Sequence, residues 1–424
     1  MTHILDELAW RGLLAQTTDE QALREALSAG PVTVYCGFDP TAPSLHHGNL
    51  VQLILLRHLQ LAGHRVVALV GGATGMIGDP RMSGERVLNS PETVAAWGER
   101  LRGQISQILD FTGENPARMV NNLDWTAGLS AIDFLRDVGK HYRLGTMLAK
   151  DTVARRLASD EGISFTEFSY QILQGMDYLE LYRRHGVTLQ TGGNDQWGNL
   201  LSGVELVRKV EQAGVHAMTT PLITKADGTK FGKSEGGSIW LAPDMMTPYA
   251  FYQFWVNTDD ADVVPYLKVF TFRPPEALAE LETAVAERPA AREAQRALAS
   301  DVTTLVHGAE ATAKVIAASQ ALFGRGELDD LDEATLRAAV AELPRAEVRE
   351  LTSDAPLVID LMTEAGLVAG RGAGRRAVAE GGVSVNNVRV TDPEAALSVD
   401  QLLHGRWAVL RRGKRTLAVA ELAD

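Results

Sequence analysis

Two short polar segments, far apart in the sequence, carry the residue types needed to hold a polyphosphate. Thr229–Ser234 reads Thr-Lys-Phe-Gly-Lys-Ser and offers two ammonium groups and a hydroxyl beside a glycine. Ser44–Leu50 leaves a predicted strand, enters a predicted helix and carries His46 and Asn49. The free backbone N–H groups of a helix N-terminus favour anions. A chain with both segments is expected to hold a nucleoside triphosphate from two sides.

Each segment also has a simpler interpretation. A Gly-Lys-Ser sequence is often only a solvated turn, and a histidine pair at a helix start is more often a cap than a catalytic site. A P-loop requires glycine, four residues and then Gly-Lys-Ser/Thr. Asp227 stands where the first glycine is needed, and Glu235–Gly237 interrupts the helix that should follow Ser234. The spacing excludes a P-loop and leaves the simpler interpretations open.

The composition is that of an ordinary globular protein with several domains. The chain has 424 residues, of which 45% are hydrophobic and 22% are charged. Cys36 is the single cysteine, which excludes an internal disulfide and a cysteine zinc cluster and favours a reducing, cytoplasmic setting. No apolar run reaches the roughly 18 residues of a membrane span. The net charge of −13 argues against indiscriminate nucleic-acid binding but allows local basic patches.

The elements around the first segment have the pattern of a β-α-β unit. Residues 32–38 predict a buried strand, a helix follows with Ser44 as its N-cap, and residues 66–70 predict a second buried strand. A short crossover between buried strands is typical of a parallel, doubly wound sheet. The pattern is then mainly helical to about His185, and residues 187–191 predict another strand. The expected fold class is α/β, with a helical insertion that splits the sheet.

The whole pattern divides the chain into five regions. These are an N-terminal helical segment (1–30), a Rossmann-like domain (31–225) with a helical insertion at about 80–185, a loop and α-helical domain (226–323), a linker (324–355) and a small α+β domain (356–424). In the last region, residues 381–388 predict a β-hairpin with Asn386-Asn387 at its turn. Arg375 and Arg376 beside this hairpin suggest a small RNA-binding module, with a solubilising helix face as the alternative.

Taken together and in order, these motifs make the chain resemble the bacterial tyrosyl-tRNA synthetases, a family of class I aminoacyl-tRNA synthetases. Leu45–Leu50 resembles the HIGH signature of the class, and Lys230–Ser234 resembles its KMSKS partner. The resemblance covers essentially the whole chain. It implies an anticodon-binding helical domain within 226–323 and an S4-type RNA-binding domain at 356–424. Three further segments match the tyrosine branch of the class: Tyr35–Thr41, Gly71–Gly75 and Gly193–Trp197.

The resemblance implies that tyrosine and ATP form tyrosyl-AMP and pyrophosphate, after which tyrosine passes to the 3′ end of tRNA-Tyr. The tyrosine carboxylate attacks the α-phosphate in line without a covalent protein nucleophile. Positioning and electrostatic stabilisation should therefore supply most of the rate. Magnesium is expected to arrive with ATP rather than in a site built by the protein. The residues implied for catalysis are Thr41, His46, Asn49, Arg86, Lys230, Lys233 and Ser234.

Two positions depart from the family pattern. Asn49 replaces the second histidine of HIGH, and an amide N–H can serve as a neutral donor in its place. The lysine that the family often places after Asp79 is missing, with Arg81 as the candidate replacement, while Arg86 is expected to keep its role. The lysines of the KMSKS-like loop should then carry more of the transition-state charge than in relatives that keep both residues.

The resemblance also implies which residues bind the substrates. A buried phenol should meet one donor and one acceptor, assigned to Tyr35 and Asp177; tyrosyl-tRNA synthetases are the standard example of such selection. Tyr170, Gln174 and Asp177 follow at i, i+4 and i+7 and share a helix face, although a surface carboxylate is the simpler reading of Asp177. The other residues implied for tyrosine are Asp79 and Gln196. Those implied for ATP are Gly37, Asp39, His47, Gly48, Gly193, Asp195 and Lys233.

For tRNA, the implied contacts are Arg208, Lys209, Arg375 and Arg376. Members of the family are homodimers whose helical insertion forms the interface, so a homodimer is expected here.

Two alternatives stay open from the sequence. Tryptophanyl-tRNA synthetases share the fold, but Tyr35, Asp177 and the S4-like region favour tyrosine. A catalytically idle RNA-binding paralogue is the second alternative, and the intact His46 and Lys233 argue against it.

Overall fold

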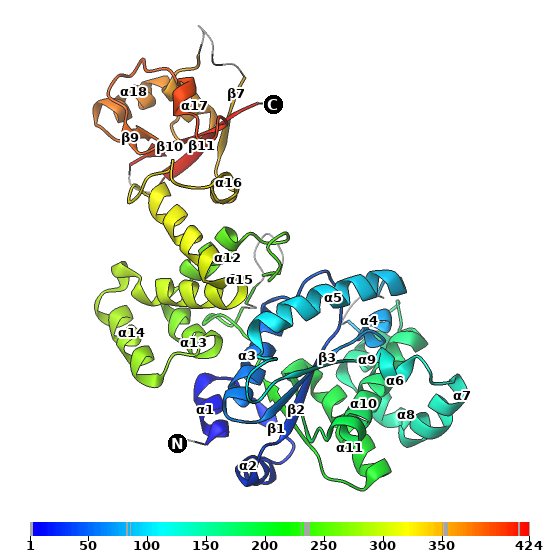
Figure 1. The fold of residues 1–424 in the computed structure, drawn as a ribbon. Helices are drawn as coiled ribbons and strands as arrows, with labels where there is room; N and C mark the ends of the chain where they lie inside the picture. The colour runs from blue at the N-terminus through cyan, green and yellow to red at the C-terminus, as the bar shows by residue number, and fades with distance from the viewer. Residues whose placement is uncertain are drawn as a thin grey trace. The chain divides into compact units, whose positions relative to one another are not determined.

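The computed structural model (Figure 1) describes residues 3–81, 84, 86–229, 231–232, 238–349, 351, 355–413 and 416–423. The chain forms two compact units. The first consists of Met1–Met246 and Asn257–Val306, and the second of Thr247–Val256 and His307–Asp424. No helix in the described part of the chain is long and apolar enough to cross a membrane.

The first unit is built on a six-stranded sheet in the order β1-β6-β5-β2-β3-β4. All neighbouring strands are parallel except β1, which runs antiparallel to β6. On one side of the sheet the strands follow in the order β2, β3 and β4, and on the other side in the order β5 and β6. The direction of the strand order therefore reverses between β2 and β5. In open α/β sheets ligands commonly bind at the carboxyl ends of the strands on either side of such a reversal, which here are β2 and β5. The strands are β1 (Gln16–Thr17), β2 (Thr33–Phe38), β3 (Arg65–Val70), β4 (Arg118–Asn121), β5 (Leu189–Gly193) and β6 (His216–Thr220).

The predicted α/β fold with a parallel, doubly wound sheet is confirmed, with two local corrections. Residues 1–30 form two helices separated by the short strand β1. The insertion at about 80–185 contains β4, which pairs with β3 and was not predicted because a four-residue strand has almost no periodicity.

The helices and helical turns are α1 (Ile4–Arg11), α2 (Glu20–Ala29), α3 (His47–Leu61), α4 (Thr74–Ile77), α5 (Pro91–Ile108), α6 (Leu123–Thr126), α7 (Ala131–Asp133), η1 (Phe134–Val138), η2 (Gly139–His141), α8 (Leu144–Leu148), α9 (Asp151–Leu157), α10 (Phe165–His185), η3 (Asn194–Gln196), α11 (Trp197–Glu211), α13 (Asp260–Phe270), α14 (Pro275–Glu287) and η4 (Pro289–Ala291).

The N-cap of α3 differs from the prediction. His46 caps this helix, because its Nδ1 accepts the backbone N–H two residues later at 3.0 Å, and Oδ1 of Asn49 accepts the N–H of His46 at 3.1 Å. The hydroxyl of Ser44 instead accepts the N–H of Ala242 at 2.9 Å. The prediction of Ser44 as the cap was wrong because a distant backbone group takes its hydroxyl.

The region 226–323, predicted as one helical domain, is divided between the two units. The side chain of Arg11 is only 3% exposed and donates to the carbonyl oxygens of Thr271 (3.1 Å) and Arg273 (3.0 Å). These bonds attach α1 to the segment that follows α13. That segment therefore belongs to the first unit. The helix α15 (Glu293–Leu322) begins in the first unit and ends in the second, and Gly308 within it has a φ of +85°.

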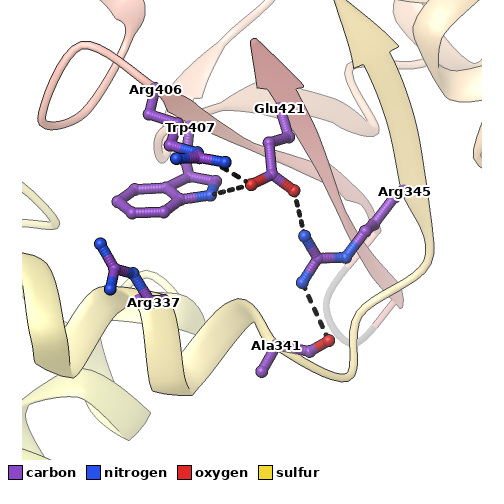
Figure 2. A pocket seen from close by; sticks show the side chains of 6 residues that line it. All are labelled: Arg337, Ala341, Arg345, Arg406, Trp407 and Glu421. Atoms are coloured by element: carbon purple, nitrogen blue, oxygen red, sulfur yellow. Dashed lines mark hydrogen bonds and ion pairs between the residues drawn. The ribbon is translucent and has the colours of Figure 1, made fainter. Parts of the chain in front are cut away.

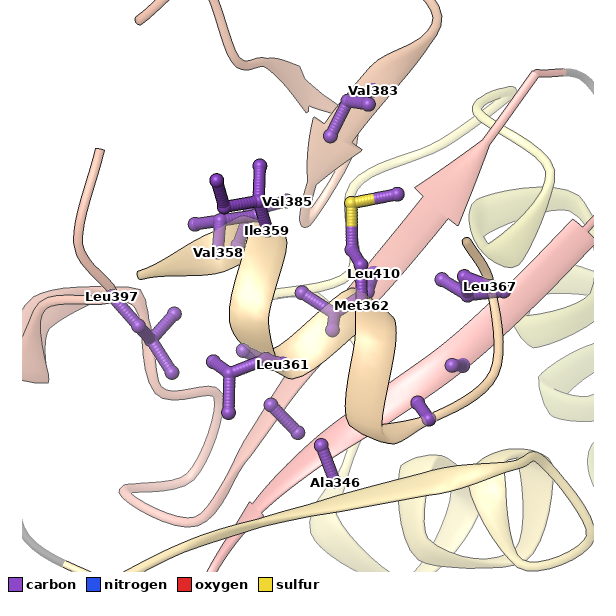
Figure 3. Packing of buried hydrophobic residues seen from close by; sticks show 14 of the residues in the cluster. Ala346, Val358, Ile359, Leu361, Met362, Leu367, Val383, Val385, Leu397 and Leu410 are labelled. Atoms are coloured by element: carbon purple, nitrogen blue, oxygen red, sulfur yellow. The ribbon is translucent and has the colours of Figure 1, made fainter. Parts of the chain in front are cut away.

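The second unit contains a five-stranded sheet in the order β7-β11-β10-β8-β9, whose core Figure 3 shows. The predicted hairpin is confirmed as β8 and β9, and Asn386 (φ +45°) and Asn387 (φ +67°) form its turn, as a type I′ turn requires. The elements of this unit are α12 (Pro248–Val256), α16 (Glu333–Val340), β7 (Arg345–Val348), α17 (Val358–Glu364), α18 (Arg371–Ala379), β8 (Val383–Val385), β9 (Val388–Arg389), η5 (Val399–Gln401), β10 (Trp407–Arg412) and β11 (Thr416–Leu422).

The segment 324–355, predicted as a linker, is part of this second fold. Its strand β7 pairs in parallel with β11, and Ala346 belongs to the core in Figure 3. Glu421 of β11 accepts hydrogen bonds from Arg345 of β7, from Nε of Arg406 (3.0 Å) and from Nε1 of Trp407 (3.1 Å), as Figure 2 shows. The linker prediction was wrong because the partner strand of β7 lies far along the chain.

Candidate active site

Most of the predicted site residues of the first unit lie at the carboxyl ends of β2 and β5. Tyr35 belongs to β2, Asp39 follows this strand directly, and Asp195 follows β5. The helices α3 and α10 bring His46 and Asp177 to the same region. The geometry around each of these residues decides what the site can bind.

Tyr35 and Asp177 are both buried, and both retain hydrogen-bonding capacity that the described residues do not use. Their exposed fractions are 1% and 2%, and the hydroxyl of Tyr35 has no hydrogen-bond partner among the described residues. Burial, and next the nearby charge of Asp177, raise the pKa of the Tyr35 phenol well above its usual value. A buried polar group without a partner is costly. The Tyr35 hydroxyl is therefore suited to a ligand that brings its own polar atom.

Two donors hold the carboxylate of Asp177 in place. Nε1 of Trp125 donates to its Oδ1 at 2.8 Å, and Nδ2 of Asn122 donates to its Oδ2 at 3.0 Å. Burial raises the pKa of Asp177 to about 7, although these two donors act in the opposite direction. Each carboxylate oxygen can accept a further hydrogen bond. These two buried residues thus offer one hydroxyl and one carboxylate acceptor.

Asp79 is the centre of a second polar group of residues. Its carboxylate accepts hydrogen bonds from Nε2 of Gln196 (3.0 Å) and Nδ2 of Asn199 (3.2 Å), and Nζ of Lys150 lies 3.9 Å away. The structure thereby brings together Asp79 and Gln196, both predicted to meet the substrate amino group. A carboxylate surrounded by amides suits an ammonium ion.

The predicted polar face of α10 points inward. Tyr170 is 6% exposed, Asp177 is buried and Gln174 between them is half-buried, so the simpler reading of Asp177 as a surface carboxylate is excluded. The hydroxyl of Tyr170 donates to Oδ2 of Asp39 at 2.7 Å. This bond links α10 to the carboxyl end of β2.

Two neutral donors stand at the N-terminus of α3. Because Nδ1 of His46 accepts a hydrogen bond, its Nε2 carries the proton, and burial lowers the pKa of His46 so that the ring is neutral. Oδ1 of Asn49 serves the cap, which leaves its Nδ2 as a donor. A Cβ on Gly48 would lie 2.9 Å from Cε1 of His46, so glycine leaves room for this cap. Asn49 can therefore act as a neutral donor, although the imidazole of the family pattern is absent.

The two described residues in the middle of the KMSKS-like loop, Phe231 and Gly232, lie against His47. Phe231 meets the His47 ring edge-on, with 5.1 Å between ring centroids, and a Cβ on Gly232 would lie 2.2 Å from Cε1 of that ring. The N–H of His47 donates to the carbonyl oxygen of Ile239 at 3.0 Å. Burial, and then the neighbouring imidazole, lower the pKa of His47 to about 4. Three predicted catalytic residues of this loop lie outside the described residues: Lys230, Lys233 and Ser234.

A buried ion pair anchors the segment that carries Arg86. Arg156 and Glu167 are each 1% exposed, with 2.9 Å between their charged atoms. Arg156 also donates to the carbonyl oxygen of Gly84 (2.8 Å), and Glu167 accepts the N–H of Arg86 (3.2 Å). Nε of Arg86 in turn donates to the carbonyl oxygen of Asp79 at 2.6 Å. The guanidinium of Arg86 is thus held beside the Asp79 group.

The other residues predicted for ATP lie at the rim. Gly193 is half-buried, and a Cβ there would lie 2.5 Å from Oδ1 of Asp195. The absence of a side chain at Gly193 therefore leaves room for the Asp195 carboxylate beside the end of β5. Four predicted residues are exposed to solvent: Gly37, Thr41, Arg81 and Asp195.

The four arginines and lysines predicted for tRNA are all exposed. In the first unit, Arg208 and Lys209 both pair with Glu205 of α11, at 2.9 and 3.5 Å. In the second unit, Arg375 pairs with Glu394 at 2.7 Å. Arg376 lines a pocket of about 270 Å³ together with Ala373, Ala377, Glu380, Gly382, Arg412 and Gly413.

Several residues of the site were not predicted. Asn122 and Trp125 were missed because their partner Asp177 lies far along the chain. Their signal in the sequence is weak: the short apolar pair Met119-Val120 is followed by two asparagines, of which Asn122 is the second. Lys150 and Asn199 have no sequence signal that separates them from ordinary helix residues.

Comparison with known proteins identifies the family. Residues 27–324 match the model of class I tRNA synthetases for tryptophan and tyrosine, and residues 335–420 match the C-terminal domain of tyrosine–tRNA ligases. The tyrosine–tRNA ligase of Streptomyces coelicolor is 65% identical over 423 residues, which cover 100% of this chain and 99% of that one. The tyrosine–tRNA ligase of Mycobacterium tuberculosis is 60% identical over 420 residues, or 99% of this chain and 98% of that one.

Solved structures agree with this assignment. A C-terminally truncated mitochondrial tyrosyl-tRNA synthetase from Aspergillus nidulans matches with a TM-score of 0.69 at 30% identity, covering 76% of this chain and 95% of that one. A tryptophanyl-tRNA synthetase from Encephalitozoon cuniculi matches with a TM-score of 0.53 at 14% identity, which shows a shared fold only. The chain belongs to the tyrosine–tRNA ligase family of class I aminoacyl-tRNA synthetases.

Proposed function

We propose that this chain activates L-tyrosine with ATP to form tyrosyl-AMP and pyrophosphate and then transfers the tyrosyl group to the 3′ end of tRNA-Tyr. The observation that carries the choice of amino acid is the buried pair of Tyr35 and Asp177. A phenol both donates and accepts, so it satisfies the carboxylate and the unpartnered hydroxyl together. An indole N–H only donates, and a phenyl ring does neither. Tyrosine is thus the aromatic amino acid that leaves no polar group of this pocket unpaired.

We assign the ends of tyrosine to separate groups of residues. The phenol lies between Tyr35 and Asp177, and the ammonium group binds the carboxylate of Asp79. Three neutral side chains complete the ammonium site: Tyr170, Gln174 and Gln196. The contacts of Asp79 with amides, and the inward face of α10, support this assignment.

For ATP, we assign the donors at the start of α3 to the phosphates. Nε2–H of His46 and the amide of Asn49 meet the charge that develops as pyrophosphate leaves, together with Arg86 and the loop residues Lys230, Lys233 and Ser234. Fixed donors that face developing charge lower the barrier. Thr41 also contacts the phosphates, and the adenosine contacts are Gly37, Asp39, His47, Gly48, Gly193 and Asp195.

We propose that Mg²⁺ enters with ATP. Magnesium keeps several waters and binds mainly through substrate phosphates, where it neutralises their charge. Among the described residues, no group of three or more His, Cys, Asp or Glu side chains is placed to hold a metal ion.

We further propose a cytoplasmic homodimer that binds tRNA through Arg208, Lys209, Arg375 and Arg376. The insertion exposes large apolar side chains suited to a second copy: Ile132 (69%), Leu135 (56%), Leu144 (66%) and Leu148 (41%). Such a cluster on a protein surface commonly marks an interface.

An ATP–pyrophosphate exchange assay with a panel of amino acids tests the activity. Exchange driven by tyrosine is expected. Exchange driven by tryptophan instead would reverse the assignment of the pocket, and tRNA binding without any exchange would support an idle paralogue.

The pH dependence of tyrosine binding should follow Asp177. The phenol donates best to an ionised carboxylate, and the pKa of Asp177 lies at about 7. Protonation then weakens binding as the pH falls, and tyrosine should bind about tenfold more weakly at pH 6 than at pH 8. Equilibrium dialysis across this range measures the effect. A pH-independent dissociation constant, or a slope that persists in Asp177→Asn, would contradict it.

Replacing both Arg375 and Arg376 with alanine should impair tRNA charging and leave pyrophosphate exchange unchanged. Each lost phosphate contact should reduce the salt dependence of tRNA binding by about one unit of slope. Glu394→Gln is the matched control, because it releases Arg375 from its partner without removing the positive charge. Unchanged charging in the double variant would show that α18 does not bind tRNA. Deletion from residue 356 is a poor substitute, because it would leave β7 without its partner strand.

A further inference from the structure

Thr74 and Asn122 connect two carboxylates of the candidate active site, the half-buried Asp39 and the buried Asp177. Thr74 is 2% exposed and Asn122 is 0% exposed. The Thr74 hydroxyl donates to Oδ1 of Asp39 at 2.6 Å. Nδ2 of Asn122 donates to Oγ1 of Thr74 at 2.9 Å and to Oδ2 of Asp177 at 3.0 Å. A continuous hydrogen-bonded chain therefore runs from the carboxyl end of β2 to the phenol pocket.

The backbone fixes the direction of each bond in this chain. The N–H of Ala73 donates to Oδ1 of Asn122 at 2.7 Å, which leaves Nδ2 to face Thr74 and Asp177. Both protons of this amide are then in use. Because Oγ1 of Thr74 accepts one of them, the single hydroxyl proton of Thr74 must go to Asp39. Both carboxylates are therefore acceptors in this chain, which is the role of an ionised carboxylate.

The outer oxygens of the two carboxylates are also hydrogen-bonded. Oδ2 of Asp39 accepts from Tyr170, and Oδ1 of Asp177 accepts from Trp125. The two carboxylates are close enough to repel one another, and this repulsion contributes to raising the pKa of Asp177. A cation that reaches Asp39 offsets this repulsion, whereas a neutral donor at Asp39 acts on Asp177 through the orientation of the hydrogen-bonded chain.

We propose that Thr74 is a positioning residue that couples nucleotide binding at Asp39 to phenol recognition at Asp177, acting through Asn122. This inference rests on the proposed contacts of Asp39 with ATP and of Asp177 with the phenol. When a ribose hydroxyl donates to Asp39, it fixes the carboxylate that holds Thr74, and the chain Asp39–Thr74–Asn122–Asp177 then holds the far carboxylate oriented toward the phenol. Selection of tyrosine over phenylalanine is then sharper with nucleotide bound than without it.

The test compares binding of tyrosine and phenylalanine, each without and with α,β-methylene-ATP, by equilibrium dialysis. In the unsubstituted protein the analogue should tighten tyrosine at least fivefold and phenylalanine by less than twofold. Thr74→Val removes the hydroxyl at nearly constant shape, and this selective gain should disappear. Thr74→Ser keeps the hydroxyl and should restore it. Thr303→Val is the matched control, because this buried hydroxyl has no partner among the described residues.

Three results would overturn the inference. One is an unsubstituted protein in which the analogue tightens both amino acids equally; this measurement needs no variant, so it holds even if Thr74→Val does not fold. The second is a Thr74→Val protein that keeps the selective gain. The third is an equal loss for both amino acids in that variant, which a merely structural role would produce. Tyrosine-driven exchange, measured on the same protein, separates failure of this inference from failure of the proposed function.

Discussion

Asp177→Asn is expected to reduce kcat/KM for tyrosine by about 100-fold in pyrophosphate exchange, which corresponds to about 2.7 kcal/mol. The substitution removes the charged acceptor of the phenol. It also replaces one of the two carboxylate oxygens, which accept from Trp125 and from Asn122, with an NH2 group, so this group faces another donor. Phenylalanine has no hydroxyl that could contact residue 177, so kcat/KM for phenylalanine should change far less. The discrimination between the two amino acids should therefore collapse.

The matched control is Glu180→Gln, on the same helix and one turn further on. Glu180 pairs with Arg183 and Arg184 and acts on Asp177 only by contributing to its raised pKa, so its substitution should leave the discrimination intact. If Asp177→Asn also keeps its discrimination between tyrosine and phenylalanine, the phenol does not contact this carboxylate.

Arg156→Met should cause the largest loss of stability, because it leaves Glu167 charged and buried without its partner. Breaking a buried ion pair in this way costs about 3–5 kcal/mol. The substitution also removes the donors to the carbonyl oxygens of Gly84 and Gly162. Both a lower thermal unfolding temperature and reduced exchange activity are expected, since this pair anchors the segment that carries Arg86.

A second substitution separates these two effects. In Arg156→Met with Glu167→Leu the buried charge is gone, so most of the stability should return. The carbonyl oxygens still lack their donor, and exchange activity should stay low. Arg183→Met, which breaks the partly exposed pairs of Arg183 with Glu211 and Glu180, is the control and should cost much less than the buried pair. Full recovery of activity in the double variant would show that the ion pair stabilises the fold without positioning Arg86.

The sequence predicted those parts of the fold that depend on neighbours along the chain. The β-α-β unit around α3 follows from buried strands and helical spacing, and the hairpin turn follows from two residues that tolerate positive φ. The polar face of α10 could be predicted because Tyr170, Gln174 and Asp177 share a helical spacing. In each case the signal and its partner lie within a few residues.

The parts that were missed depend on distant partners. Ser44 looks like an N-cap until Ala242 takes its hydroxyl, and β7 looks like a linker until β11 pairs with it. Asn122 and Trp125 gain their roles only from Asp177 in another helix. Helix and strand propensities and hydrophobic periodicity depend only on residues close in the sequence. The residues that hold the site side chains in place could therefore not be predicted, although several of the side chains implied to contact the substrates could.

The strand order of the second unit has a consequence for synthesis on the ribosome. β11 lies between β7 and β10, yet it follows both of them in the chain. Until β11 has emerged, β7 has no partner strand, and the core that Ala346 and Val348 share with α17 lacks the residues of β11. Ribosomes that stall between β10 and β11 would therefore release a chain with an open strand edge, which is a substrate for chaperones and proteases.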